Sequence, residues 1–216
     1  MAAMRIHLAL LVIATVLTAC GEAPLPAPKS DPITRRTTAS GEVVGFVAAN
    51  GSHVWRGIPY AAPPTGALRW RAPRDPQPWQ GTREALAFGA RCPQYTSSLE
   101  ATRELGTVYG SEDCLTLNVF APPRAEAERL PVMFWIHSGG NVQGGSDFYD
   151  GGALAVNQRV VVVSLNYRLG PLGWLRHAAL REGATYEEAS GNFGTLDMIH
   201  APVSYTHLTL PTNREV

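Results

Sequence analysis

Two apolar runs on either side of a glycine-rich loop constrain the fold of this chain more than any other feature. Residues 132–136 read VMFWI and residues 160–165 read VVVVSL, so neither run alternates between apolar and polar side chains. Continuous apolar strands are typical of a sheet covered by helices on both faces, whereas half-exposed strands alternate. Residues 152–158 predict a short helix between the two strands, and residues 115–120 predict a third strand. The sequence therefore predicts an α/β fold.

The two ends of the globular part predict a hairpin and a helix. Residues 37–60 alternate between apolar and polar side chains around Asn50-Gly51, a dipeptide that favours a tight turn between two strands. Residues 194–201 begin a helix. Pro202 is expected to interrupt that helix, because proline has no backbone N–H group to donate.

The first 20 residues resemble an export signal. Arg5 gives a positive start, and the apolar run at residues 8–17 is too short to cross a bilayer. Residues 17–20 read LTAC, which resembles a bacterial lipobox, in which the cysteine, here Cys20, is acylated and becomes the new N-terminus. The alternative is a short buried helix with a chance cysteine. Lipid chains on Cys20 would anchor the exported protein to a bacterial membrane, on its periplasmic or cell-surface side.

The exported part begins with a tether and contains two further cysteines. Residues 21–33 hold four prolines among small and charged residues, a composition typical of an extended tether. Export implies an oxidising compartment, so Cys92 and Cys114 are expected to form a disulfide, worth about 3 kcal/mol in the chain-entropy model. The alternative is a pair of free buried thiols. No histidine lies near them in the sequence, which argues against a zinc site.

The glycine loop that follows residues 132–136 carries the strongest local indication of chemistry. It reads HSGGN at residues 137–141, and Gly144 and Gly145 follow. Backbone N–H groups converge on an anion only where side chains do not block them, and glycine removes that obstacle. The loop resembles the HGGG-type loop of lipases and esterases, which donates N–H groups to a tetrahedral oxyanion. The alternative is an ordinary strand-to-helix turn; a dinucleotide site would need G-x-G-x-x-G, a spacing that is absent.

Several other segments match one known family in the family's own order. They are GIPYAAPP at residues 57–64, LRW at 68–70, EDCLTLNV at 112–119, NYRLG at 166–170, and GNFG with LD at 191–197. Together with the glycine loop, they resemble the type-B carboxylesterases, the family that includes the cholinesterases. The resemblance covers nearly all of residues 40–201 and implies the N-terminal portion of an α/β-hydrolase fold: a hairpin, a disulfide loop and the first strands of the sheet.

The resemblance assigns roles to particular residues. It implies that Gly139 and Gly140 are the donors of an oxyanion hole, and that Cys92 and Cys114 form the family's first disulfide. Ser138 replaces the first glycine of the family's triplet, which is not a donor; a serine there would strain the loop if the backbone had a positive φ. The segment between the two cysteines contains no tryptophan, which disfavours a choline ester as substrate.

Other polar residues in the motifs are expected to be structural. Arg168, Asn192 and Asp197 match positions that brace loops around the family's site, and we expect them to be core polar residues with satisfied hydrogen bonds. His137 belongs to the oxyanion loop in this family, which makes it a poor candidate for a catalytic base. Three further histidines have no motif context and are expected to be surface residues or core residues with satisfied hydrogen bonds: His53, His177 and His200.

The family's nucleophile does not occur among the 216 residues. It sits in G-x-S-x-G on a strand-to-helix turn, and no serine in this chain has glycines at both flanking positions. The acid and the histidine of the triad follow the serine along the chain. We therefore expect residues 34–201 to be the N-terminal part of a serine esterase that needs no cofactor and acts on small-molecule esters, and the chain alone to be inactive. The alternative is a non-catalytic binding or adhesion lipoprotein on the same fold.

The last residues match nothing in the family. Residues 203–212 read VSYTHLTLPT, and their back-translation resembles an adaptor used in DNA sequencing libraries. Residues 202–216 are therefore expected to be a non-native tail; the alternative is a genuine short strand. The chain has no net charge, which gives no electrostatic reason to expect a nucleic-acid partner.

Overall fold

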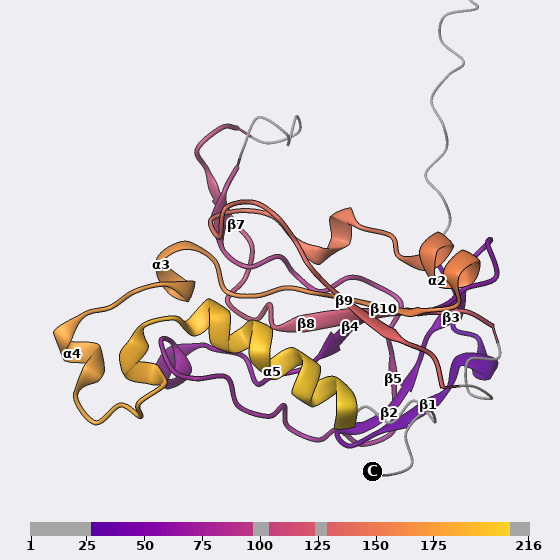
Figure 1. The fold of residues 1–216 in the computed structure, drawn as a ribbon, viewed down its shortest axis with the longest axis horizontal. Helices are drawn as coiled ribbons and strands as arrows, with labels where there is room; N and C mark the ends of the chain where they lie inside the picture. The colour runs from indigo at the N-terminus through magenta and orange to yellow at the C-terminus, as the bar shows by residue number, and fades with distance from the viewer. Residues whose placement is uncertain (1–26, 97–103, 124–128, 208–216) are drawn as a thin grey trace, which may run out of the picture.

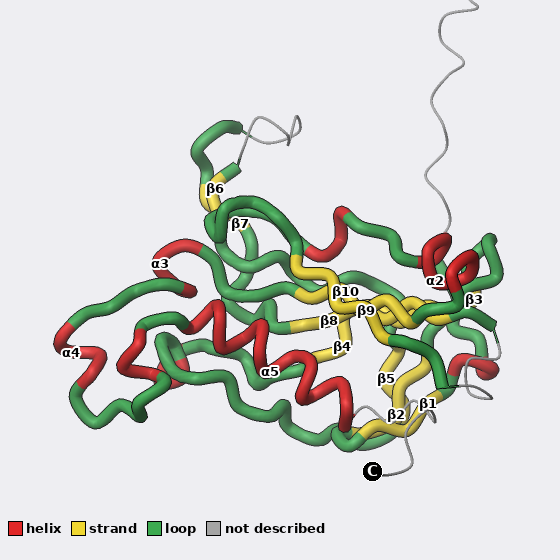
Figure 2. The backbone as a smooth tube through the Cα atoms, in the orientation of Figure 1, coloured by secondary structure: helices red, strands yellow, loops and turns green. Residues whose placement is uncertain are grey.

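The three predicted apolar strands lie side by side in one mixed sheet. The computed structural model describes residues 27–96, 104–123 and 129–207, and side chains up to residue 204. The sheet has the order β3 (Phe46–Val47), β4 (His53–Pro59), β8 (Thr116–Ala121), β10 (Val161–Leu165) and β9 (Val132–Ile136) (Figures 1 and 2). Among the described strands of this sheet, β9 and β10 are parallel and the other neighbouring pairs are antiparallel. The leader, Cys20, residues 21–26 of the tether and the last nine residues lie outside the described residues.

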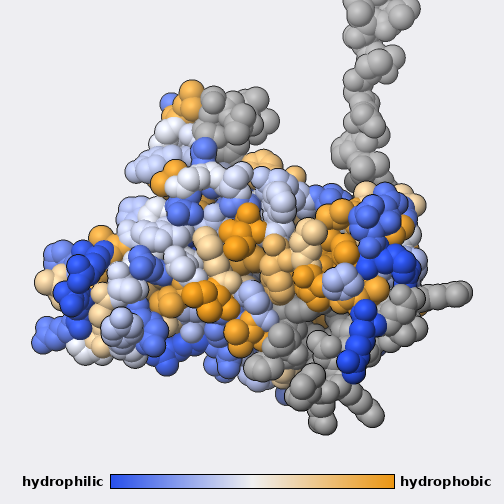
Figure 3. All heavy atoms as spheres, viewed as in Figure 1, coloured by the Kyte–Doolittle hydropathy of each residue, from blue (hydrophilic) through white to orange (hydrophobic). Residues whose placement is uncertain are grey.

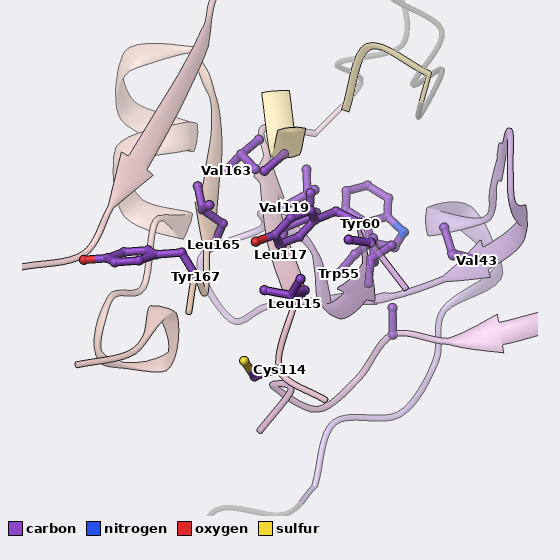
Figure 4. Close-up of a cluster of buried hydrophobic side chains, with 14 of the residues drawn as sticks. Val43, Trp55, Tyr60, Cys114, Leu115, Leu117, Val119, Val163, Leu165 and Tyr167 are labelled. Atoms are coloured by element: carbon purple, nitrogen blue, oxygen red, sulfur yellow. The ribbon is translucent and has the colours of Figure 1, made fainter. Parts of the chain in front are cut away.

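Both faces of the central strands are buried, because successive side chains point to opposite faces. On one face, Phe120 of β8 and Val162 of β10 pack with Ala155 of helix α2 (Gly152–Gln158), the helix predicted between the two strands. On the other face, Val119 and Val163 pack in a larger cluster that Figure 4 shows around Trp55, Leu117 and Leu165. Helix α5 (Phe193–His207) contributes Ala201 to this second cluster. Helices therefore lie on both sides of β8 and β10, as the continuous apolar runs predicted.

Strand β9 differs from that prediction. Four of its side chains are exposed: Val132, Met133, Trp135 and Ile136, with 39% to 48% of their surface accessible. In the described part of the chain β9 is an edge strand that pairs only with β10, so neither of its faces is fully covered. Figure 3 shows hydrophobic side chains gathered across the middle of this side of the molecule, over β9 and α5.

The predicted N-terminal hairpin is two hairpins. Strands β3 and β4 pair around Asn50-Gly51, as expected, and Gly51 has the left-handed φ of +82° that such a turn requires. A second hairpin precedes it: β1 (Arg36–Thr38) pairs with β2 (Gly41–Val44), which also pairs with β5 (Thr82–Glu84) in a separate three-stranded sheet.

The expectation that Pro202 interrupts the last helix is wrong. Helix α5 continues through Pro202 to His207. Proline removes one backbone hydrogen bond from the helix interior, but packing of one helix face against the sheet is a larger source of helix stability in proteins. Ala201, directly before the proline, is fully buried in the core. Among the described residues, no helix combines the length and the apolar character that crossing a membrane requires.

Short elements complete the chain and mostly border the loops at the carboxyl ends of β9 and β10. They are η1 (Pro32–Thr34), η2 (Gly66–Leu68), β6 (Gln94–Tyr95), β7 (Val108–Tyr109), η4 (Ser146–Phe148), α3 (Gly170–Gly173), α4 (Ala178–Arg181) and η5 (Glu188–Ser190). Strands β6 and β7 form a small hairpin within the segment between the two cysteines, where the sequence predicted only a loop.

Candidate functional site

The glycine loop begins where β9 ends, at the same edge of the sheet as the loop that follows β10. The two strands are parallel and in register, with Ile136 opposite Leu165, so their carboxyl ends lie together. Ligand sites in open α/β sheets form at this edge. The two loops touch: the Gly170 N–H donates to the Asn141 carbonyl at 2.7 Å, and the Tyr167 hydroxyl donates to the His137 carbonyl at 2.8 Å.

Three consecutive residues of the loop have left-handed backbone conformations. The φ angles of Gly139, Gly140 and Asn141 are +125°, +62° and +64°. The Gly139 carbonyl accepts hydrogen bonds from the N–H groups of Val142 and Gln143, each at 3.2 Å, which folds the loop back on itself. Within the described part of the chain, the N–H groups of Gly139 and Gly140 donate no hydrogen bond. Two adjacent backbone donors are therefore available to an anion.

Glycine is required at Gly139 but less strictly at Gly140. A Cβ atom at Gly139 would lie 1.9 Å from the Gln143 carbonyl oxygen, a distance that no packing adjustment tolerates. A Cβ atom at Gly140 would have no neighbour within 4 Å, so only its backbone angle favours glycine. Ser138, which replaces a glycine of the family, is not among the described residues with a positive φ. The serine therefore causes no backbone strain, and its hydroxyl lies 3.2 Å from that of Tyr149.

His137 supports the loop from the inside. Its ring stacks on Tyr167 with centroids 4.3 Å apart, and its Nδ1 lies 2.9 Å from the Ser138 carbonyl oxygen. Only 3% of the residue is exposed, and this burial lowers the pKa of His137 below its usual value, although the hydrogen bond to Ser138 acts in the other direction. A neutral ring with its Nδ1–H donated to the loop suits a structural role, in agreement with the sequence-based interpretation.

A buried ion pair braces the loop after β10. Arg168 Nε donates to Asp197 Oδ2 at 2.8 Å, and its NH2 group donates to Oδ1 at 2.7 Å. The Arg168 backbone N–H also donates to Asp197, and Nη1 donates to the Arg71 carbonyl at 2.9 Å. Burial raises the pKa of Asp197, while the hydrogen bonds from Arg168 lower it. These two residues are core polar residues with satisfied hydrogen bonds, as predicted; Asn192 is exposed instead, so the prediction for it was wrong.

A network of buried amides behind the loop was not predicted. Asn166 Oδ1 accepts from the Ser146 N–H at 2.8 Å, and its Nδ2 donates to the Ala90 carbonyl at 3.0 Å. Asn118, fully buried in β8, donates from Nδ2 to the hydroxyls of Ser146 and Ser164, each at 3.0 Å. The signal was present in the sequence, because Asn118 and Ser164 are polar residues inside otherwise apolar strands and must find buried partners.

The disulfide is formed, and the three other histidines singled out in the sequence differ in burial. Cys92 and Cys114 are bonded and both buried. His53 is buried in β4, His177 is exposed and accepts from the Ala179 N–H at the start of α4, and His200 of α5 is half-buried with its Nε2 3.4 Å from an Asp75 carboxylate oxygen. No group of three or more metal-ligating side chains occurs among the residues that the structure describes.

Comparison with known proteins agrees with this geometry. The profile of the carboxylesterase family matches residues 32–202, which include the glycine loop, the disulfide and the Arg168–Asp197 pair. The chain belongs to the carboxylesterase family. Its fold is that of the N-terminal portion of an α/β-hydrolase: the PNB esterase structure superposes with a TM-score of 0.70 at 41% identity, over 81% of this chain and 35% of that chain. A Geobacillus stearothermophilus carboxylesterase gives a TM-score of 0.69 at 36% identity, over 81% of this chain and 34% of its own.

Two curated relatives share more than two fifths of their residues with this chain in the matched region. The para-nitrobenzyl esterase of Bacillus subtilis is 45% identical over 167 residues, which are 76% of this chain and 32% of that protein. The fumonisin B1 esterase of Sphingopyxis macrogoltabida is 44% identical over 181 residues, 82% of this chain and 32% of that protein. The chain therefore spans about a third of the length of these relatives.

Proposed function

We propose that the full-length protein containing this chain hydrolyses carboxylic esters through an acyl-serine intermediate, and that Gly139 and Gly140 form its oxyanion hole. The observation that carries the proposal is the pair of adjacent backbone N–H groups without partners in the described structure, held open at the carboxyl end of β9. Membership of the carboxylesterase family supports ester hydrolysis as the reaction. The nucleophile is assigned to a part of the protein beyond these 216 residues, because no G-x-S-x-G occurs among them.

The proposed role of the loop follows from the charge that forms during the reaction. When the serine oxygen adds to the ester carbonyl, the carbonyl electron pair moves to the oxygen, and a tetrahedral oxyanion results. The N–H groups of Gly139 and Gly140 donate to that oxyanion. The intermediate collapses with loss of the alcohol, and water then attacks the acyl-enzyme and generates a second oxyanion in the same place. One such donor is typically worth roughly 100- to 1000-fold in kcat.

The substrate is proposed to be a small-molecule ester. The relatives named above include a para-nitrobenzyl esterase and a fumonisin B1 esterase, whose names point to different esters. The disulfide loop between Cys92 and Cys114 contains no tryptophan to hold a quaternary ammonium group, which argues against choline esters.

A non-catalytic binding lipoprotein is the alternative on the same fold. Such a protein has no need for two unpaired N–H groups in a loop that admits only glycine at position 139. The conformation of Gly139, with its carbonyl engaged by Val142 and Gln143, therefore favours the enzyme.

The first prediction concerns turnover. We expect the full-length protein, obtained by sequencing the gene beyond Ala201 from source DNA, to hydrolyse p-nitrophenyl acetate, and an organophosphate to abolish that activity. The matched control is the 216-residue chain without its leader and with Cys20→Ala, for which we expect no turnover. An inactive full-length protein whose sequence lacks the serine turn would favour the binding alternative.

The second prediction concerns localisation. We propose that Cys20 is lipidated and that the protein is anchored to a bacterial membrane on its periplasmic or cell-surface side, which the LTAC sequence at residues 17–20 motivates. Intact mass of the protein from the membrane fraction is expected to show an N-terminus at Cys20 carrying acyl chains, and Cys20→Ser is expected to move the protein out of that fraction. A mature N-terminus at any other residue would contradict the proposal.

A further inference from the structure

Gln94 holds the glycine loop from a distant part of the sequence. The Gly144 N–H donates to Gln94 Oε1 at 2.8 Å, and Gln94 Nε2 donates back to the Gly144 carbonyl at 2.7 Å. Nε2 also donates to the Cys92 carbonyl at 3.0 Å, and only 6% of Gln94 is exposed. Because both backbone groups of one residue are bound, Gly144 can neither slide nor rotate without leaving buried polar groups unpaired.

The disulfide fixes the backbone next to Gln94. Gln94 follows Cys92 by two residues, and Cys92 is bonded to Cys114, which leads directly into β8. On the other side of Cys92, Arg91 makes a two-point ion pair with Asp147, with Nε and NH2 each 2.8 Å from a carboxylate oxygen. These hydrogen bonds to Asp147 raise the pKa of Arg91. Arg91 and Gln94, on either side of Cys92, therefore both bind the segment at residues 144–147 that follows Gly139 and Gly140.

Gly144 in turn touches the beginning of the loop. A Cβ atom on Gly144 would lie 2.5 Å from the Ser138 carbonyl oxygen and 2.6 Å from His137 Nδ1, so the backbone of Gly144 packs directly against both residues. Next to it, the Gln143 carbonyl packs against Gly139 at the distance that excludes a side chain. The position of Gly144 is thus transmitted to Gly139 through direct contact, without an intervening flexible segment.

We propose that Gln94 is a positioning residue for the oxyanion loop: its amide fixes Gly144, and Gly144 fixes the backbone N–H groups of Gly139 and Gly140 relative to the reacting carbonyl. The proposal rests on the ester hydrolysis proposed above. A positioning residue affects the rate of the chemical step and the ground-state binding of the ester differently, whereas a merely structural residue does not. Loss of Gln94 misplaces donors that act on the oxyanion, so it slows the chemical step and leaves ground-state binding of the ester nearly unchanged.

The test compares two substitutions in the full-length protein. Gln94→Leu keeps the size of the side chain and removes both hydrogen bonds to Gly144. Gln94→Glu keeps the acceptor for the Gly144 N–H and removes the donor to its carbonyl. We expect kcat for p-nitrophenyl acetate to fall about 10- to 100-fold in Gln94→Leu and at least as much in Gln94→Glu, whose buried carboxylate would face the carbonyl oxygens of Gly144 and Cys92, with KM changed less than about twofold. The Ki of a trifluoromethyl ketone, which forms an oxyanion on the enzyme, should rise in proportion to the loss of kcat/KM.

Thr34→Val is the matched control. Thr34 is also fully buried, and its hydroxyl donates to the Asp31 carbonyl at 2.6 Å and accepts from the Gly45 N–H at 2.9 Å. It lies in η1 beside β3, at the opposite edge of the sheet from β9. We expect Thr34→Val to lower Tm by a similar amount to Gln94→Leu and to leave kcat unchanged. Unchanged kcat in both Gln94 variants, or parallel losses in Thr34→Val, would overturn the proposal.

A second readout separates this proposal from the proposed function. Hydrogen exchange of the peptide covering residues 137–145 should become roughly tenfold faster in Gln94→Leu, and no faster in Thr34→Val. If the unsubstituted protein hydrolyses no ester, the proposed function fails, and the exchange rates still decide whether Gln94 holds the loop. Unchanged exchange in Gln94→Leu would contradict the positioning role whatever the activity.

Discussion

Replacing Gly139 with alanine in the full-length protein is expected to lower kcat for ester hydrolysis by at least about 100-fold. The added Cβ would lie 1.9 Å from the Gln143 carbonyl oxygen, and the residue would have to keep a φ of +125° that an L side chain rarely adopts. The loop must therefore rearrange, and the donors of Gly139 and Gly140 leave their positions. The rearrangement is confined to a surface loop, so we expect Tm to stay close to that of the unsubstituted protein while kcat falls.

Gly140→Ala is the control for this prediction. The alanine keeps the backbone N–H, meets no atom within 4 Å, and needs only a left-handed conformation with φ of +62°, at a cost of about 1–2 kcal/mol. We expect its kcat to fall less than about tenfold, since a strain of that size is shared by ground and transition states. Equal losses in the two variants would show that the close packing of Gly139 is not what holds the donors.

Removing one partner of the Arg168–Asp197 pair is expected to destabilise the full-length protein by about 3–5 kcal/mol, because it leaves an uncompensated buried charge. Arg168 and Asp197 expose 3% and 0% of their side chains, so water cannot replace the lost partner. The measurement is the free energy of unfolding in urea for Asp197→Leu and Arg168→Met. The double substitution should recover part of the loss, because two apolar side chains leave no charge behind.

An exposed ion pair provides the control for the buried one. Arg35 and Glu42 pair in the N-terminal sheet, with 50% and 33% of their side chains exposed. Arg35→Met should change stability little, since water solvates the remaining carboxylate. If Asp197→Leu were as mild as Arg35→Met, or if the double substitution were no more stable than the single ones, the buried pair would not be the brace that its hydrogen bonds suggest.

The sequence predicted the helices and strands that are determined by residues close together in the chain. The helix at Gly152–Gln158 and the strand at Val132–Ile136 have the predicted bounds, because each segment lies between residues that interrupt it: Gly151 and Arg159 for the helix, Pro131 and His137 for the strand. The β1–β2 hairpin was missed because its short turn between Thr38 and Gly41 carries no Asn-Gly or similar turn dipeptide. Gly45, where the chain passes from β2 to β3, depends on a distant contact instead: a Cβ atom there would lie 2.0 Å from the Val54 carbonyl oxygen of β4.

The residues of the candidate site also fall into those that a local motif predicts and those that depend on distant contacts. Gly139 and Gly140 were found from a contiguous motif, HSGGN. Gln94 was not, because its partner Gly144 lies 50 residues further along the chain and nothing in the local sequence links them. The continuation of α5 through Pro202 was missed because local propensity argues against it and packing decides. Contacts between distant segments are therefore where the structure adds most to the sequence.

The most direct test of the central claim is a crystal structure of the full-length protein with a trifluoromethyl ketone bound. The account predicts a covalent adduct on a serine in G-x-S-x-G, with the adduct oxygen roughly 2.7–3.1 Å from the backbone nitrogens of both Gly139 and Gly140. An adduct whose oxygen faces other donors would contradict the assignment of the oxyanion hole. A protein that forms no adduct and lacks the serine would contradict the proposed reaction itself.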